Sequence, residues 1–270
     1  FYIRRTIRIF PAYFFYLFIC SLLHFMQIIK ISPYSWLSAI TYTKYLNWSL
    51  DWYTAHAWSL SIEEQFYLVW PLVFIAGQTG RKFFVYILIL SVPVFRYLDH
   101  HYSLEWIDEM SIFVRIDAIA CGCFLALYRQ RIITVISPYS KVIYLTAFIL
   151  IFTLRAFPVI FENTSFSQIF IPLGVSHGTI ANICIALIIL KSIDVQKGVW
   201  FRLLNLKSLS YIGTLSYSIY LWQQLIINKT GHWLSLFPQN IFFVAVLSLF
   251  SYYAIERPFL KFKDKFNALQ

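Results

Sequence analysis

Residues 168–190 have the sequence QIFIPLGVSHGTIANICIALIIL, a run of 23 residues that contains no Asp, Glu, Lys or Arg. A helix needs about 20 mostly apolar residues, each adding about 1.5 Å, to cross the hydrocarbon core of a membrane. The run therefore predicts a membrane-spanning helix, which decides the class of fold to look for in the rest of the chain.

Similar apolar runs recur along the whole sequence and predict an all-α, polytopic transmembrane bundle of about eight spanning helices. The expected spans are Pro11–Ile29, Leu60–Ala76, Phe83–Leu98, Ser111–Tyr128, Val142–Ile160, Gln168–Leu190, Leu209–Asn228 and Asn240–Ile255. Several contain Pro or polar residues, which bundled helices tolerate when neighbours satisfy the backbone. The segment Trp36–Trp48 is too short and too polar to span, and we expect an amphipathic helix along the membrane surface.

The composition supports a membrane protein. Apolar residues make up 60% of the chain, charged residues only 13%, and the mean hydropathy is +0.67. A soluble domain has about 25% charged residues, so an ordinary cytosolic enzyme, a disordered chain and a disulfide-stapled secreted module are excluded. The four cysteines fall in apolar runs without a CxxC pair, and we interpret them as small buried hydrophobic residues.

The positive charges alternate with the predicted spans. The net charge is +10, and most of the 22 Lys and Arg fall in alternate connections, the pattern of cytoplasmic loops. These residues are Arg4, Arg5, Arg8, Arg81, Lys82, Arg129, Arg131, Lys141, Lys191, Lys197, Arg202, Lys207, Arg257, Lys261, Lys263 and Lys265. The opposite connections carry Asp51, Asp99, Glu105, Asp108, Glu109 and Glu162. Both termini are predicted to be cytoplasmic, and nucleic acid is excluded as a partner because the basic excess follows the topology.

Two adjacent carboxylates, Glu63 and Glu64, lie about one turn inside the outer boundary of the second predicted span. Glu64 fits a capping box with Ser61, in which it would only hold the helix N-terminus. Glu63 lies about 100° further round the helix and has no such explanation. We expect Glu63 to face a polar cavity, where it could bind hydroxyl groups or orient a base.

The fourth predicted span contains Arg115 and Asp117, which are two residues apart and therefore cannot face each other on one helix. Each needs a partner on another helix. The pair could grip an anionic or hydroxylated substrate, or it could simply fix the packing of the bundle.

Arg5 and Arg8 lie at the cytoplasmic start of the first span, three residues apart. They could be ordinary cytoplasmic anchors. If the helix includes both arginines, they share a face and could bind a polyphosphate by bidentate hydrogen bonds.

Three further polar groups fall inside the predicted spans. His24 and His177 are explained by packing or, alternatively, by proton transfer. Gln223 could bind neighbouring helices together or line a passage for a sugar. The sequence contains no HExxH, P-loop or GxSxG motif, so an enzyme of this sequence would work without a metal or a serine-hydrolase nucleophile.

Five stretches, in this order, resemble the acyltransferase-3 family of integral membrane enzymes, which transfer acyl groups to carbohydrates and related acceptors. They are FYIRRTIRIFPAY at 1–13, AWSLSIEEQFYLVWPL at 57–72, RIDAIACGC at 115–123, LSYSIYLW at 215–222 and IERPF at 255–259. The second stretch is the most specific.

The resemblance implies that residues 1–270 are a single membrane-embedded acyltransferase domain that is incomplete at its N-terminus. The chain has no initiator Met, and nothing in it matches the family's first two spans, which carry the histidine regarded as the catalytic base. The main base is therefore expected upstream, and this fragment alone is expected to be inactive. Glu63 and Asp117 would have supporting catalytic roles. Substrate-binding roles are expected for Arg5, Arg8, Trp58, Arg115 and Gln223, the last replacing a histidine that relatives often have.

Together these features predict a membrane O-acyltransferase of the bacterial inner membrane. It would move an acyl group, expected to be acetyl, from acyl-CoA to a hydroxyl of an envelope polysaccharide or lipopolysaccharide. Its expected partners are acyl-CoA, the carbohydrate and the lipid bilayer, with no bound cofactor. The alternatives are a transporter of a saccharide or small molecule and a non-catalytic membrane scaffold.

Overall fold

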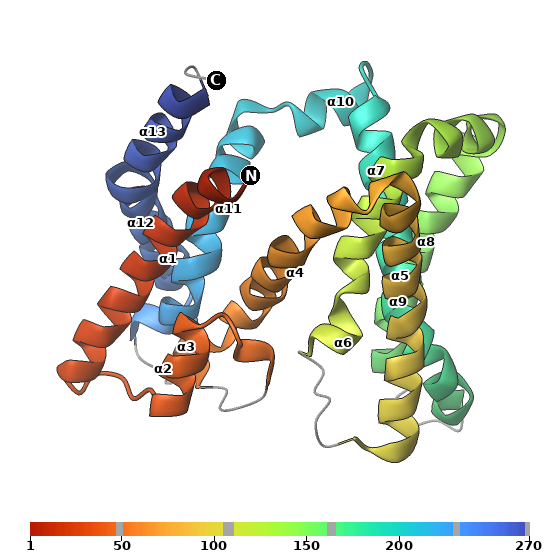
Figure 1. Ribbon diagram of the computed structural model, residues 1–270. Coiled ribbons are helices and arrows are strands. Elements are labelled where there is room, and N and C mark those ends of the chain that lie inside the picture. Colours follow the sequence, from red (N-terminus) through yellow and green to blue (C-terminus); the bar gives the residue numbers. More distant parts are fainter. Residues whose placement is uncertain (47–50, 105–110, 161–165, 229–232, 268–270) are drawn as a thin grey trace. The chain divides into compact units, whose positions relative to one another are not determined.

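The computed structural model describes the backbone of residues 1–46, 51–104, 111–160, 166–228 and 233–267, and the side chains of these residues except 100, 155–177 and 263–267. All regular structure in these residues is helical (Figure 1). The chain divides into two compact units. Unit 1 comprises Phe1–Lys44, Trp48–Ala57 and Asn205–Gln270, and unit 2 comprises Tyr45–Asn47 and Trp58–Leu204.

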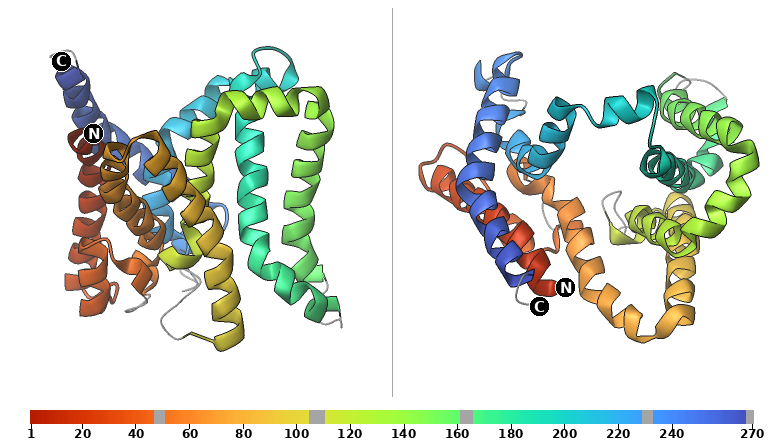
Figure 2. Two further views of the ribbon diagram at one scale, coloured as in Figure 1. Left: turned by 45° about the vertical axis from the view of Figure 1, so that its right-hand side comes forward. Right: turned by 90° about the horizontal axis from the view of Figure 1, so that it is seen from above.

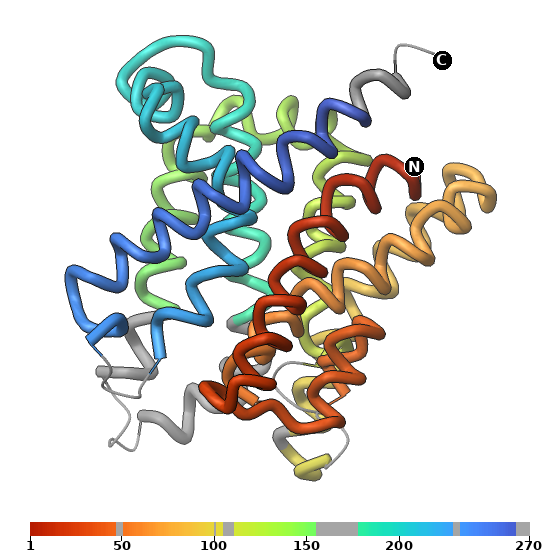
Figure 3. The backbone as a smooth tube through the Cα atoms, turned by 90° about the vertical axis from the view of Figure 1, so that its left-hand side faces the viewer, coloured from red at the N-terminus to blue at the C-terminus, as the bar shows by residue number. Residues whose placement is uncertain are grey.

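Unit 1 is built from helices that are far apart in the sequence. Its elements are α1 (Tyr2–Phe25), α2 (Pro33–Ile40), the turn η1 (Lys44–Leu46), α3 (Trp52–Ala55), α11 (Lys207–Ile226), η3 (Trp233–Ser235), α12 (Gln239–Ser251), the π-helical turn η4 (Tyr252–Glu256) and α13 (Arg257–Asn267). Helix α1 packs against α11, η4 and α13, and α11 packs against α12 (Figure 3). The first and last helices of the chain therefore share one core.

Unit 2 contains the central part of the chain. Its elements are α4 (Ala57–Ile75), α5 (Gly77–Tyr102), α6 (Ile112–Arg115), α7 (Asp117–Ile136), η2 (Ser137–Tyr139), α8 (Ser140–Ile160), α9 (Phe166–Asp194) and α10 (Val199–Leu204). Helices α5, α7 and α9 contact one another, and α8 lies along α9 (Figure 2). A buried cluster of Ile62 and Phe66 from α4, Val92 from α5 and Ile116 holds α4 to this group.

The prediction of an all-α membrane bundle is confirmed, and each expected span overlaps a long helix. Within the described residues, three helical runs are long and apolar enough to cross a membrane by length and composition alone: Tyr2–Phe25, Asp117–Leu154 and Gln239–Phe262. The first helix begins nine residues earlier than the predicted boundary at Pro11, because that proline lies inside α1 and does not start it.

The expected surface helix over Trp36–Trp48 differs from the structure. Helix α2 starts at the N-cap Ser32, whose hydroxyl accepts a hydrogen bond from the Ser35 N–H, and it ends before Tyr42, which has a φ of 54°. The short turn η1 follows, and Trp48 lies outside the described residues. A left-handed residue cannot continue an α-helix, so the segment splits. Glu105, Asp108, Glu109 and Glu162 also lie outside the described residues.

Candidate functional site

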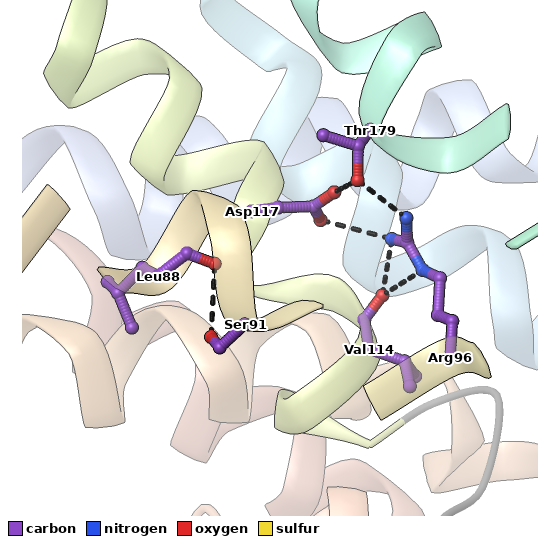
Figure 4. Close-up of polar contacts among 6 residues, drawn as sticks. All are labelled: Leu88, Ser91, Arg96, Val114, Asp117 and Thr179. Atoms are coloured by element: carbon purple, nitrogen blue, oxygen red, sulfur yellow. Dashed lines mark hydrogen bonds and ion pairs between the residues drawn. The ribbon is translucent and has the colours of Figure 1, made fainter. Parts of the chain in front are cut away.

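A buried polar cluster holds three helices of unit 2 together (Figure 4). The Asp117 side chain at the start of α7 is fully buried, and both of its oxygens accept hydrogen bonds. Arg96 of α5 donates to Oδ1 at 3.1 Å, and Thr179 of α9 donates to Oδ2 at 2.6 Å. Arg96 also donates to the Thr179 hydroxyl at 2.9 Å. Asp117 therefore links α5, α7 and α9 through hydrogen bonds within the protein. We call Arg96, Asp117 and Thr179 the interhelical clasp.

The local backbone explains why this clasp forms here. The helix breaks at Ile116, between α6 and α7, and carbonyls at a helix end need partners outside the helix. Arg96 supplies one by donating from Nε to the Val114 carbonyl at 3.0 Å. On α9, a Cβ at Gly178 would lie 2.6 Å from Arg96 Nη1, so a larger residue there would require the guanidinium to shift.

Arg115 and Asp117 have separate partners, as their spacing predicts. The Arg115 guanidinium lies over the ring of Trp58 on α4, with 5.8 Å between Cζ and the ring centroid. Asp117 pairs with α5 and α9 instead. The prediction that each residue meets another helix is confirmed, while their roles toward a substrate stay predictions.

The two adjacent carboxylates lie near the start of α4. Glu63 and Glu64 are both half-buried. The capping box proposed for Glu64 is wrong, because α4 begins at Ala57 and Ser61 is therefore inside the helix. Helix capping therefore does not explain the presence of Glu64. The catalytic role expected for Glu63 stays a prediction.

Unit 2 also contains apolar cavities beside these helices. One, of about 290 Å³, lies between α5, α7 and α9 and is lined by residues such as Ile89, Phe124 and Ile183. A second, of about 520 Å³, lies between α7 and α9. None of the predicted site residues lines either cavity.

The arginine pair of unit 1 lies on the first turns of α1. Because this helix begins at Tyr2, it includes both Arg5 and Arg8, which confirms the condition for them to share a face. Arg5 is half-buried and Arg8 exposed. Arg8 interacts electrostatically with Glu256 at the end of the π-helical turn. That carboxylate is buried and also accepts a hydrogen bond from Ser218 of α11. One positive charge of the pair is therefore partly balanced.

At the other end of α1, the connection to α4 buries a lysine. Lys44 is only 1% exposed and donates to the Ser35 hydroxyl, which also shares a hydrogen bond of 2.8 Å with Thr54. Burial lowers the pKa of Lys44 to about 8, although the charge of nearby Asp51 opposes that change. The connection thus has a defined polar interior.

His56 lies in the same connection, immediately before α4. Its ring packs edge-on against Tyr16 of α1, with centroids 5.3 Å apart, and at a tilt against Tyr220 of α11, with centroids 5.1 Å apart. The Tyr220 hydroxyl donates to the His56 carbonyl. Neither ring nitrogen has a hydrogen-bond partner in the described part of the chain, although the residue is only 8% exposed. Burial, followed by the positive charge of Lys44, lowers the pKa of His56 to about 4, so the imidazole is neutral.

A family model described as an acyltransferase domain matches residues 1–256. The chain belongs to this acyltransferase family. The peptidoglycan O-acetyltransferase OatA of Listeria monocytogenes is similar, with 30% identity over 195 residues. These residues are 68% of this chain and 30% of the relative, so the chain spans less than a third of that protein's length. No solved structure matches the chain.

Membership of the acyltransferase family confirms the resemblance carried by the five sequence stretches. The remaining polar residues that the sequence singled out differ in burial and in hydrogen-bond partners. Gln223 is half-buried on α11, and its neighbour Gln224 exchanges two hydrogen bonds with Trp52. His24 accepts a hydrogen bond from the Ile31 N–H, so it has a structural partner. The side chain of His177 lies outside the described residues.

Sequence reasoning about this acyltransferase-family chain missed Arg96, Thr179 and His56. Arg96 lies inside a predicted span, where an ionised residue needs a partner, and that signal could have linked it to Asp117. His56 lies outside the predicted spans, whereas the candidate residues were chosen among polar residues inside the spans.

Proposed function

We propose that the intact protein is a membrane O-acyltransferase of the bacterial inner membrane, transferring an acetyl group from acetyl-CoA to a carbohydrate hydroxyl. Family membership supports acyl transfer, and the relative's name suggests peptidoglycan as the carbohydrate to test first. An envelope polysaccharide or lipopolysaccharide is the broader class.

The observation that carries the proposal is the pair of arginines on one face of α1. Guanidinium groups three residues apart on a helix can grip phosphates by paired, charge-assisted hydrogen bonds. Acyl-CoA carries such phosphates, and the charge pattern predicts a cytoplasmic position for Arg5 and Arg8. Glu256 partly balances the charge of Arg8, so the pair has a smaller net positive charge than two isolated arginines. The remaining positive charge favours binding of an anion.

The reaction joins the acceptor oxygen to the acyl carbon. The O–H bond of the acceptor breaks, the C–S bond of the thioester breaks, and the proton and the sulfur leave as the free thiol of CoA. A base must hold the proton between these events, and groups near the carbonyl must stabilise the oxyanion. We assign to Glu63 of unit 2 the binding or orientation of a hydroxyl or base, and to Asp117 the positioning of its helix.

The proposal is tested by acetyl transfer with the intact protein in membrane vesicles. Labelled acetyl-CoA and soluble peptidoglycan fragments are supplied, and label in the fragments is measured. Arg5→Ala with Arg8→Ala should raise the KM for acetyl-CoA about tenfold or more, because each charged hydrogen bond contributes about 1.5–3 kcal/mol. Arg8→Lys keeps the charge but loses the bidentate geometry, so it should have an intermediate KM.

Arg131→Ala is the control. Arg131 is exposed, is also predicted to be cytoplasmic and lies on α7 rather than on α1, so its loss should leave the KM for acetyl-CoA unchanged. An unchanged KM in the double variant would refute the assignment of the arginines. Movement of unmodified saccharide across the vesicle, with no label incorporated, would favour the transporter alternative.

A further inference from the structure

Buried polar atoms rarely lack hydrogen bonds, and His56 lacks two. More than about 90% of buried polar groups in folded proteins are paired, since an unpaired one costs about the free energy of its desolvation. His56 is only 8% exposed, and both ring nitrogens are without a partner in the described residues. The ring is nevertheless held in place by Tyr16 and Tyr220. A fixed, unsatisfied imidazole is the arrangement expected where a ligand completes the hydrogen bonds.

The chemistry of the ring limits what that ligand can be. A neutral imidazole offers one N–H donor and one acceptor nitrogen. A carboxylate or phosphate only accepts, and an ammonium group only donates, so each would leave one nitrogen unpaired. A hydroxyl group both donates and accepts, and a carbohydrate carries several. Aromatic walls with a few placed polar groups are also typical of sites for small organic ligands, and Tyr16 and Tyr220 provide such walls here.

We propose that His56 binds hydroxyl groups of the carbohydrate acceptor as a neutral imidazole, and so positions the acceptor for acyl transfer. This inference rests on the proposed function. It gives unit 1 a subsite for the acceptor in addition to the arginine pair for the donor. Tyr16 lies eleven residues after Arg5 on α1, so the two subsites are about 16 Å apart along the helix axis.

The protonation state separates this role from that of a base. A general base works best when its pKa is near the working pH. The groups that face His56 are Tyr16 with Cys20 beside it on α1, Tyr220 on α11 and the ammonium of Lys44. Burial and Lys44 together hold the pKa of the ring near 4, too low for efficient proton abstraction at neutral pH. His56 therefore binds the hydroxyl, and the proton goes to a different group.

The test compares two variants of the intact protein in the acetyl-transfer assay with peptidoglycan fragments. His56→Phe keeps a ring but removes both hydrogen-bonding atoms, and should raise the KM for the fragments about tenfold while the KM for acetyl-CoA stays the same. His56→Gln keeps one donor and one acceptor and should restore the KM to within about threefold of the wild type. Between pH 6 and pH 8 the pH profiles of wild type and His56→Gln should coincide.

Folding is measured on the same preparations. Removing two unpaired polar atoms from an aromatic site should leave the melting temperature of His56→Phe equal to or above that of the wild type. His101→Phe, a change at an exposed histidine of unit 2, is the control and should change neither KM.

Three results overturn the inference. An unchanged KM for the fragments in His56→Phe would mean that the ring binds only water. Equal loss of kcat in both variants, with a changed pH profile, would mean that His56 transfers the proton. A lower melting temperature with unchanged KM values would mean that it only packs. Failure of the wild type to transfer acetyl would overturn the proposed function itself.

Discussion

Two buried polar side chains, Asp117 of unit 2 and His56 of unit 1, differ in whether the protein satisfies their hydrogen bonds. In unit 2, Asp117 is enclosed by Arg96 and Thr179, and both carboxylate oxygens are used within the protein. In unit 1, the ring nitrogens of His56 are buried without a partner among the described residues. The first arrangement stabilises the contact of three helices, and the second leaves hydrogen bonds available to a ligand. A charged residue inside a membrane span is therefore weaker evidence for chemistry than an unpaired buried one.

The largest effect is expected from Asp117→Ala. The change leaves Arg96, whose side chain is 13% exposed, without its carboxylate, and breaking a buried ion pair typically costs about 3–5 kcal/mol. Thermal unfolding in detergent should show a large drop in melting temperature. If the variant instead melts like the wild type and has no acetyl transfer, Asp117 is catalytic and the contrast between Asp117 and His56 is lost.

A smaller loss is expected from Gly178→Ala. The added Cβ would lie 2.6 Å from Arg96 Nη1 and would displace the guanidinium from the clasp. Overpacking of this kind costs about 1–3 kcal/mol. Gly122→Ala on α7 is the matched control, because nothing lies within 4 Å of its Cβ. Equal melting temperatures of the two variants would show that Arg96 is not held as tightly as the clasp requires.

A pH effect is expected in unit 1 from Lys44. Its pKa falls from 10.5 to about 8 on folding, so between these values the unfolded chain binds more protons than the folded one. Stability should therefore increase as the pH rises from about 8 to about 10.5, with a melting temperature higher by roughly 2–4 °C for each kcal/mol gained. Lys44→Met should lack this increase, and the same slope in both proteins would contradict the assignment.

The smallest effect is expected from an exposed ion pair of unit 2. Arg129 donates to Asp194 at 2.7 Å, but the two side chains are 52% and 30% exposed. Pairs of this kind contribute about 0–1 kcal/mol and are screened by salt. Asp194→Asn should hardly change the melting temperature at 0.5 M salt. A loss as large as that of Asp117→Ala would mean that burial does not distinguish the two pairs.

The sequence predicts the helices well, because an apolar run of about 20 residues has few alternatives in a membrane. It also predicts that Arg115 and Asp117 have separate partners, since a spacing of two places them on different faces. It does not identify those partners, because Arg96 and Thr179 are brought to Asp117 only by the packing of three helices. His56 could not be found from periodicity or span depth, since its significance is the absence of a hydrogen bond in the folded chain.

Measuring acetyl transfer and the melting temperature together for His56→Phe and Asp117→Asn tests whether His56 binds the acceptor while Asp117 stabilises the fold. We expect His56→Phe to keep its melting temperature but to need about tenfold more peptidoglycan fragments for half-maximal transfer. We expect Asp117→Asn to melt at a lower temperature and to retain the wild-type KM for the fragments in the molecules that remain folded. The reverse pattern, with transfer lost only in a stable Asp117→Asn, would contradict these two roles.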